Sequence, residues 1–149
     1  MVRTLSLIVI LLLSSCKEKP HNKNLSHSET LHRTDEIVIQ SYRKYMSDYG
    51  ESFTPIGGKK FHRNNIAVLQ SFKSLFNESE KTDYCCCPDV TYSISFCDNN
   101  ETINSYHVDT VEFQNKVRIY KPDYQYSYLI EKQLWKRFME KFIETRTNR

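Results

Sequence analysis

Glycine is scarce in this chain. The 149 residues include three glycines, Gly50, Gly57 and Gly58, and none follows Lys59. A phosphate-binding loop and the G-x-S-x-G turn of α/β-hydrolases both need glycine at fixed spacings. The long glycine-free part of the chain therefore cannot hold either motif, which argues against nucleotide-dependent chemistry and against an α/β-hydrolase.

A strong excess of one charge is also missing. The chain has 21 basic and 18 acidic residues, whereas a nucleic-acid-binding protein concentrates basic residues on one face. We therefore expect no nucleic-acid partner. Hydrophobic residues make up 39% of the chain and aromatic residues 13%, which is too apolar for a wholly disordered protein. The length favours one domain and leaves no room for a second, catalytic one.

The apolar run at the N-terminus is too short to cross a bilayer, which takes about 20 helical residues. It extends from Leu5 to Leu13, interrupted only by Ser6, and it follows the basic Arg3. This pattern is typical of a secretory signal peptide. The sequence Leu13-Ser14-Ser15-Cys16 resembles the lipobox of bacterial lipoproteins.

That resemblance implies a diacylglycerol on the Cys16 thiol, cleavage between Ser15 and Cys16, and acylation of the new amino terminus. More than one acyl chain is what stable anchoring requires. The expected location is the cell envelope, with the protein lipid-anchored to a membrane, in particular the outer membrane. Lys17-Glu18 resembles, incompletely, the charged signal that sends some lipoproteins of the Bacteroidetes to the cell surface. Periplasmic and surface orientations therefore both stay open.

Polar residues dominate the stretch that follows Cys16, with Leu25 and Leu31 as its large apolar residues. We interpret residues 16–33 as a flexible tether that carries the lipidated cysteine. The predicted organisation is thus a signal peptide over 1–15, this tether over 16–33 and a single domain over 34–149.

Two helices are predicted at the start of the domain. Val38, Tyr42, Tyr45 and Tyr49 recur with helical spacing, which predicts a helix over 35–49, although the β-branched run from Ile37 to Ile39 favours a strand. Pro55 and two glycines predict a loop over 52–60. Apolar spacing predicts a second helix over 64–76, and polar residues predict a turn over 77–82.

The pattern then changes to a period of two. Alternation over 90–96 predicts a strand, and Asp98-Asn99-Asn100 predicts a hairpin turn without glycine. The return strand over 102–108 has Ile103 out of phase, which predicts a bulge or a loose register there. Strands over 116–120 and 124–129 and an amphipathic helix over 131–145 follow. The fold class is α+β, with two N-terminal helices, a four-stranded antiparallel meander sheet and a C-terminal amphipathic helix packed on it.

Cysteines are the most distinctive feature of the predicted domain. Cys85-Cys86-Cys87 precedes Pro88, and Cys97 follows ten residues after Cys87. Four cysteines besides Cys16 would suit two disulfides in an oxidising compartment. A straight strand of about 3.3 Å per residue would hold Cys97 roughly 25–30 Å from the other three, so we expect it to remain a thiol or to bond to a second molecule.

Three roles for this cysteine cluster stay open: a structural staple or buried thiols, thiol redox chemistry, and metal binding. Consecutive side chains on an extended backbone alternate in direction, so at most Cys85 and Cys87 could share one ion. We predict no metal site and no cofactor.

Tyrosines gather near the end of the predicted sheet, at Tyr120, Tyr124, Tyr126 and Tyr128. The last three share parity, so they are expected on one face of their strand, either in the core or as a binding surface. Gln125 and Ser127 between them are polar, so we expect the other face to be solvated, which favours the core.

No catalytic constellation is recognisable. The aspartates, Asp109 among them, fall mostly at predicted turns, where their side chains cap backbone N–H groups. His107 lies near Asp109 without a nucleophile. The sequence favours a non-enzymatic lipoprotein that binds another envelope or secreted protein, either as an inhibitor or immunity protein or as part of an envelope complex. The alternative is a thiol-redox or metal-binding lipoprotein that uses the cysteine cluster.

Overall fold

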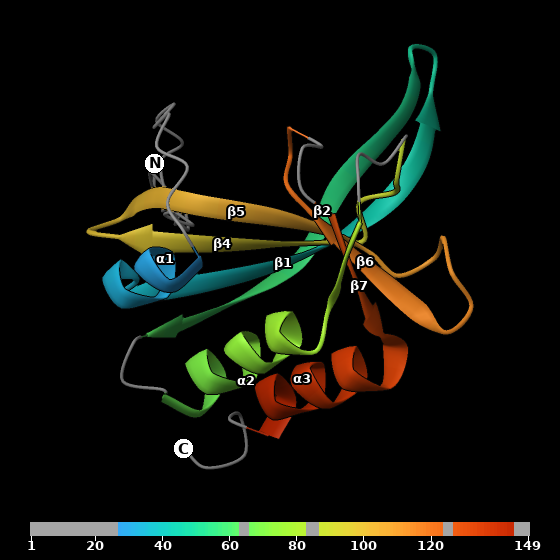
Figure 1. Ribbon diagram of the computed structural model, residues 1–149. Helices are drawn as coiled ribbons and strands as arrows, with labels where there is room; N and C mark the ends of the chain where they lie inside the picture. Colours follow the sequence, from blue (N-terminus) through green and yellow to red (C-terminus); the bar gives the residue numbers. More distant parts are fainter. Residues whose placement is uncertain (1–26, 63–65, 83–86, 124–126, 145–149) are drawn as a thin grey trace, which may run out of the picture.

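A computed structural model describes residues 27–62, 66–82, 87–123 and 127–144 (Figure 1). Three helices and seven strands follow one another as α1 (His27–Arg33), β1 (Glu36–Ser47), β2 (Gly50–His62), α2 (Ile66–Asn77), β3 (Glu80–Thr82), β4 (Tyr92–Asp98), β5 (Glu101–Asp109), β6 (Lys116–Tyr120), β7 (Ser127–Glu131) and α3 (Lys132–Glu144). The α+β class is confirmed.

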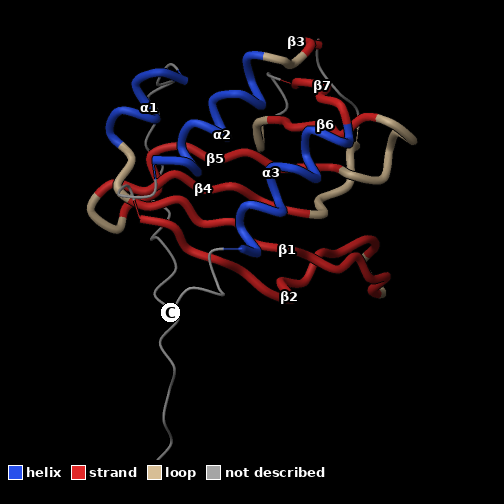
Figure 2. The backbone as a smooth tube through the Cα atoms, turned by 90° about the horizontal axis from the view of Figure 1, so that it is seen from below, coloured by secondary structure: helices blue, strands red, loops and turns tan. Residues whose placement is uncertain are grey.

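The strands form one antiparallel sheet in the order β2-β1-β4-β5-β6-β7-β3. Helices α2 and α3 lie side by side on one face of it (Figures 1 and 2). The predicted meander is confirmed as β4 to β7, and the C-terminal helix packs on the sheet. The sheet has seven strands, so the prediction of four was wrong.

The core lies between this sheet face and the two helices. Phe72 of α2 is fully buried at its centre, with ring centroids of Phe96, Phe138 and Tyr106 at 4.7, 6.1 and 6.3 Å. The predicted helix over 64–76 is confirmed as α2, because its apolar spacing matches the face that it buries.

The hairpin between β4 and β5 confirms two further predictions. Asn99 and Asn100 have φ angles of 52° and 64°, the left-handed conformation that asparagine tolerates. Phe96 pairs with Asn104 and Cys97 with Thr102, so Ile103 is the extra residue of a bulge.

The first predicted helix is wrong. Residues 36–47 form β1, in which Ile37 and Ile39 alternate with less buried neighbours, while Tyr45 is half exposed and Tyr49 is fully exposed. The helical spacing of the tyrosines therefore marks no buried face, and the preference of the β-branched run for a strand prevailed.

The predicted loop over 52–60 is also wrong, because these residues form β2 at the edge of the sheet. Pro55 and glycine are tolerated there since an edge strand need not pair on both sides. Gly50 adopts a φ of 112° where β2 begins, directly after the turn of the β1–β2 hairpin.

Two shorter segments differ from expectation. Residues 27–33, expected in the tether, form α1, which is held by a hydrogen bond from Asn104 Nδ2 to the buried Thr30 Oγ1 (2.9 Å). The predicted turn over 77–82 ends in β3, which pairs with β7. Both segments are short and polar, so they carry no apolar periodicity that would reveal them.

Candidate functional site

The cysteines are divided between the described and undescribed parts of the chain. Cys16, Cys85 and Cys86 lie outside the described residues. Cys87 is an exposed thiol with a φ of 51°, just before Pro88. Cys97 is fully buried and disulfide-bonded, and its partner lies outside the described residues.

The expectation that Cys97 stays a thiol or bonds to a second molecule is therefore wrong. That expectation assumed that one straight strand separates Cys97 from Cys85, Cys86 and Cys87. It also assumed that lipid blocks the Cys16 thiol, so no cysteine of the chain remained as a partner. Cysteine pairing cannot be deduced from spacing alone.

The described tyrosines do not share a surface. Tyr120 pairs with Ser127, and its neighbour Ile119 pairs with Tyr128, so Tyr120 and Tyr128 lie on opposite faces of the sheet. Tyr120 is fully buried and donates to the Asp89 carbonyl oxygen at 3.2 Å, while Tyr128 packs against the Phe76 ring at 5.1 Å. Tyr124 and Tyr126 lie outside the described residues.

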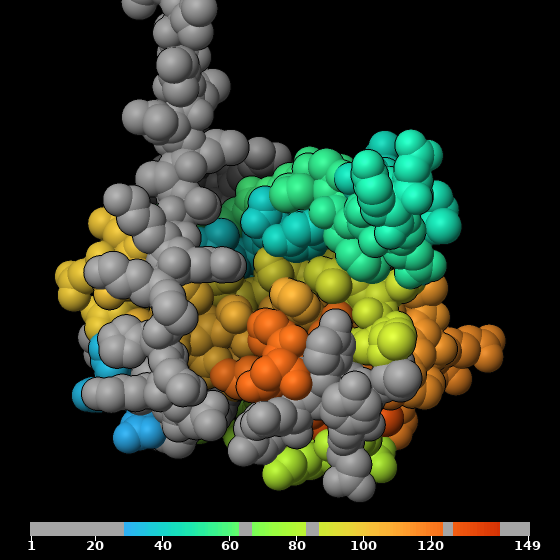
Figure 3. All heavy atoms as spheres, turned by 90° about the horizontal axis from the view of Figure 1, so that it is seen from above, coloured from blue at the N-terminus to red at the C-terminus, as the bar shows by residue number. Residues whose placement is uncertain are grey.

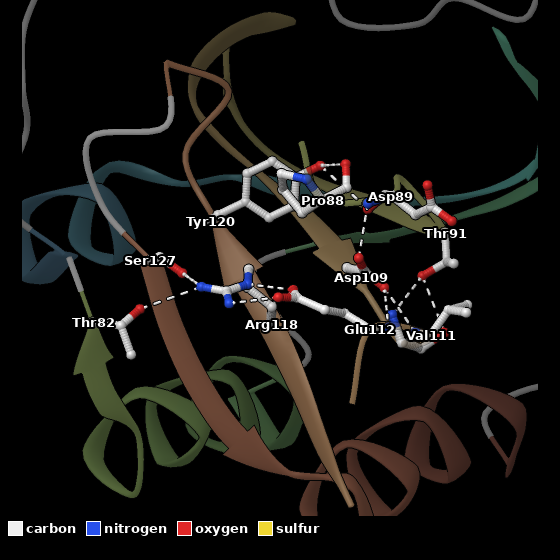
Figure 4. A network of polar contacts seen from close by, with 11 residues as sticks. Thr82, Pro88, Asp89, Thr91, Asp109, Val111, Glu112, Arg118, Tyr120 and Ser127 are labelled. Atoms are coloured by element: carbon white, nitrogen blue, oxygen red, sulfur yellow. Dashed lines mark hydrogen bonds and ion pairs between the residues drawn. The ribbon is translucent and has the colours of Figure 1, made fainter. Parts of the chain in front are cut away.

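Arg118 is the centre of a polar network on the sheet face opposite α2 and α3 (Figure 4). Its Nε and Nη2 donate to the two carboxylate oxygens of Glu112 at 2.6 and 2.8 Å, and its Nη1 donates to Ser127 Oγ at 2.7 Å. Ser127 is fully buried, so the expectation that this side of β7 is solvated was wrong. A buried hydroxyl is tolerated there because the guanidinium supplies its partner.

Asp109 extends the same network toward the loop between β5 and β6. The carboxylate is buried and accepts hydrogen bonds from the backbone N–H groups of Asp89, Val111 and Glu112 at 2.8, 2.7 and 3.0 Å. These bonds fix the loop that places Glu112 beside Arg118. The geometry is that of a carboxylate capping a turn, as the sequence predicted for Asp109.

A groove of about 490 Å³ lies between α2 and α3. Its walls include Gln70, Ser74 and Arg137, above the apolar Leu75 and Phe138. The Ser74 hydroxyl donates to the Gln70 carbonyl oxygen of its own helix at 3.1 Å. The groove therefore offers a polar rim, with no pair of side chains arranged for proton transfer among the residues that line it.

The most unusual surface is the outer part of the β1–β2 hairpin, residues 42–56, which we call the arm. It projects beyond the rest of the sheet (Figure 1) and forms a separate lobe in the space-filling view (Figure 3). Among the described residues, five large hydrophobic side chains are exposed, and four lie on the arm: Tyr45 (48%), Met46 (73%), Tyr49 (101%) and Ile56 (56%).

The arm projects because β1 and β2 continue beyond the point where β4, the strand next to β1, begins. β1 pairs with β4 only as far as Ser41, opposite Tyr92, while its pairing with β2 continues to Ser47. Lys44 braces the base of the arm through Glu51 at 2.8 Å and Asp89 at 2.9 Å. The hydrogen bonds to these two carboxylates raise the pKa of Lys44, and the bond to Glu51 has the larger effect.

The arm was missed by reasoning from sequence. A hairpin signal is present, since Asp48-Tyr49-Gly50 contains turn-forming residues between segments rich in aromatic residues. The helical spacing of three tyrosines obscured it.

Comparisons with known proteins found no matching family model, no matching curated protein and no matching solved structure. Within residues 27–62, 66–82, 87–123 and 127–144, no group of three or more His, Cys, Asp or Glu residues could hold a metal ion. None of the helices in these ranges is long and apolar enough to span a membrane.

Proposed function

We propose that this chain is a bacterial lipoprotein, anchored in the cell envelope through lipid on Cys16, whose domain binds another envelope or secreted protein without catalysing a reaction. The signal-like N-terminus and the lipobox resemblance support the anchor. They concern residues outside the described part of the structure, so the anchor depends on sequence alone.

The observation that carries the binding role is the arm. Soluble domains rarely expose several large apolar side chains on one small element unless that element contacts another molecule. An isolated two-stranded ribbon is also only marginally stable in water. Four large apolar side chains on such a ribbon suggest a surface that is covered when the protein acts.

The polar network favours binding over catalysis as well. A catalytic carboxylate or guanidinium must keep hydrogen-bonding capacity for a substrate. The buried Asp109 carboxylate instead accepts three backbone N–H groups, and Arg118 engages Glu112, Ser127 and Thr82. These groups stabilise the sheet and its loop.

The anchor is tested by growing cells that express the full chain with an alkyne-tagged fatty acid. We expect label on the wild type and on Cys87→Ser, and none on Cys16→Ser. Label on Cys16→Ser, or its absence from the wild type, would contradict the proposal. The Cys87→Ser control shows that loss of label is specific to Cys16.

Binding is tested on the full chain in intact cells with an amine-reactive crosslinker. We expect a discrete covalent complex with one other protein, at constant stoichiometry if the protein belongs to an envelope complex. An inhibitor would instead form the complex only when its target is present. Recovery of the uncomplexed chain alone, whatever the crosslinker concentration, both from cells grown alone and from cells exposed to secreted proteins of competing bacteria, would contradict the binding role.

The alternative function is thiol-redox or metal chemistry at Cys85, Cys86 and Cys87. The exposure of the Cys87 thiol is the observation that favours it, because reactive thiols are accessible. Metal analysis and thiol–disulfide exchange measurements on the purified chain test this role. A metal-free protein whose thiols do not exchange would remove it.

A further inference from the structure

The outer arm is a two-stranded ribbon that is tied to the rest of the domain at its base, where the Tyr42 N–H donates to the Thr91 carbonyl oxygen and Lys44 bonds to Asp89. Six register pairs, from Tyr42–Pro55 to Ser47–Gly50, have no third strand beside them in the sheet order. At about 3.3 Å per residue the ribbon extends roughly 20 Å beyond the point where β4 stops. It is convex and narrow, so it fits a concave partner better than a flat one.

Apolar side chains occur on both faces of the ribbon. Tyr45 and Met46 are successive residues of β1 and therefore point to opposite faces, while Tyr49 lies in the turn at the tip. Ile56 is the extra residue of a bulge, since Ser41 pairs with Gly57 and Tyr42 with Pro55. A flat surface would cover one face and leave the other in water, so the occupant needs two walls.

A bilayer does not meet this requirement. The ribbon has open edges whose backbone N–H and C=O groups would find no hydrogen-bond partners in hydrocarbon. Asp48 and Glu51 are also exposed at and beside the tip. Inserting them into lipid would remove two carboxylates from water at high cost. A protein cleft supplies both apolar walls and hydrogen-bonding groups.

Strand addition along β2 is disfavoured as well. Pro55, the bulge at Ile56 and the consecutive Lys59 and Lys60 interrupt this edge. Proline, bulges and lysine are the features that keep edge strands from pairing with other chains. The β2 edge is therefore less suited to contact with a partner than the tip and its side chains.

The tip lies far from the end of the domain where the tether joins, so a partner could reach it from the side opposite the anchor. The chain leads from α1 into β1 at Glu36, and the tip begins at Ser47, eleven residues further on. That separation is about 36 Å along the strand. With lipid at Cys16, the end of the domain nearest the tether and the tip are at opposite ends of β1.

We infer that the arm is a wedge that enters an apolar cleft of a partner protein tip first, with Tyr49 and Met46 leading. This inference rests on the proposed binding function and names the surface and the kind of partner. Tyrosine suits such a role because it offers a large area for the loss of few rotamers. The four exposed side chains together offer on the order of 500 Å² of contact. Lys44, bonded to Glu51 and Asp89, holds the arm in place before binding, which lowers the entropic cost of binding.

The test is photocrosslinking in intact cells that express the full chain. A benzophenone amino acid is placed at position 46 or 49, and at position 111 as a control, because Val111 is 66% exposed on the loop between β5 and β6 and does not belong to the arm. We expect positions 46 and 49 to crosslink to one and the same protein, at residues that line a cleft of that protein. Position 111 should give less than one tenth of that yield.

Other outcomes would overturn the inference. Crosslinks from the arm to lipid, to a second copy of this chain, or to a flat surface of a partner each contradict a cleft-binding wedge. Crosslinks to a protein from position 111 but not from the arm would remove the wedge and leave the binding function standing. The absence of protein crosslinks at all three positions, together with a negative amine-crosslinking result, would remove both.

A matched pair of variants supplies an independent readout. Tyr49→Asp and Val111→Asp each place a charge at an exposed position, so both chains are expected to fold with the circular dichroism spectrum of the wild type. Tyr49→Asp should reduce the yield of the amine-crosslinked complex at least tenfold, and Val111→Asp less than twofold. Equal yields from the two variants would refute the wedge.

Discussion

The polar network around Arg118 gives a prediction whose size follows from its contacts. Replacing Arg118 by Met keeps much of the aliphatic stem and removes the guanidinium. The fully buried Ser127 hydroxyl then loses the donor at 2.7 Å. A buried polar group without its partner costs about 1–3 kcal/mol.

The Glu112 carboxylate adds a smaller amount. It loses a two-point contact at 2.6 and 2.8 Å, but its side chain is 35% exposed, so water replaces part of that interaction. The Arg118 guanidinium also lies 5.2 Å from the centre of the Phe113 ring. We therefore expect Arg118→Met to lower the free energy of unfolding by about 2–4 kcal/mol.

The assay is equilibrium unfolding in urea, followed by the fluorescence of Trp135, the single tryptophan of the chain. Arg137→Met is the matched control, because Arg137 is exposed on α3 and its replacement should cost less than about 0.5 kcal/mol. In a cycle with Glu112→Gln, the double variant should lose about 1 kcal/mol less than the sum of the single losses. A loss below about 1 kcal/mol for Arg118→Met, or strict additivity in the cycle, would show that Arg118 does not stabilise Ser127 and Glu112 in this way.

Three further predictions concern the core and the cysteines. Trp135 is buried against Tyr92, so Trp135→Ala should cost about 3–5 kcal/mol in thermal or urea unfolding; a cost below about 1 kcal/mol would contradict its place in the core. Burial, with a smaller contribution from Tyr128, raises the pKa of Tyr106 from 10.0 to about 12. The neutral phenol therefore stabilises the fold fully below pH 10, and this contribution, on the order of 2 kcal/mol, is lost as the pH rises through 12. Tyr106→Phe should make stability fall less steeply over that interval in urea titrations, and an unchanged slope would count against the assignment. Native protein treated with a maleimide should be modified at Cys87 and not at Cys97, since Cys87 is an exposed thiol and Cys97 is buried in a disulfide; peptide mapping that finds modified Cys97 would show the reverse.

The elements that could be predicted from sequence are those whose pattern matches their burial. The apolar residues around Ile94 and Phe96 alternate in the sequence, and both side chains are fully buried on the face covered by α2 and α3. Ser93 and Cys97 on the other face are buried as well, which the alternation did not predict. The turn at Asn99 and Asn100 has a local cause, because asparagine accepts a positive φ. Local signals of this kind need no knowledge of the rest of the fold.

The elements that were missed depend on distant partners. α1 is held to β5 by the hydrogen bond between Asn104 and Thr30, which no local pattern announces. β1 and β2 extend into an arm whose exposed tyrosines do not follow a buried face, so their spacing misled the helix prediction. The same exposure that obscured the arm in the sequence identifies it in the structure as the candidate binding surface.

The lipid proposed on Cys16 limits which cysteines can bond to Cys97. A thioether to diacylglycerol would remove Cys16 from disulfide chemistry, and Cys87 is a thiol, so a lipidated chain leaves Cys85 or Cys86 to bond with Cys97.

The most direct measurement is mass spectrometry of peptides from the full-length gene product, purified from membranes without reduction. We predict an N-terminal peptide that begins at Cys16 and carries diacylglycerol and an acyl group, together with a crosslinked peptide that joins Cys97 to Cys85 or Cys86. A peptide that retains residues 1–15, or one that joins Cys16 to Cys97, would contradict lipidation at Cys16.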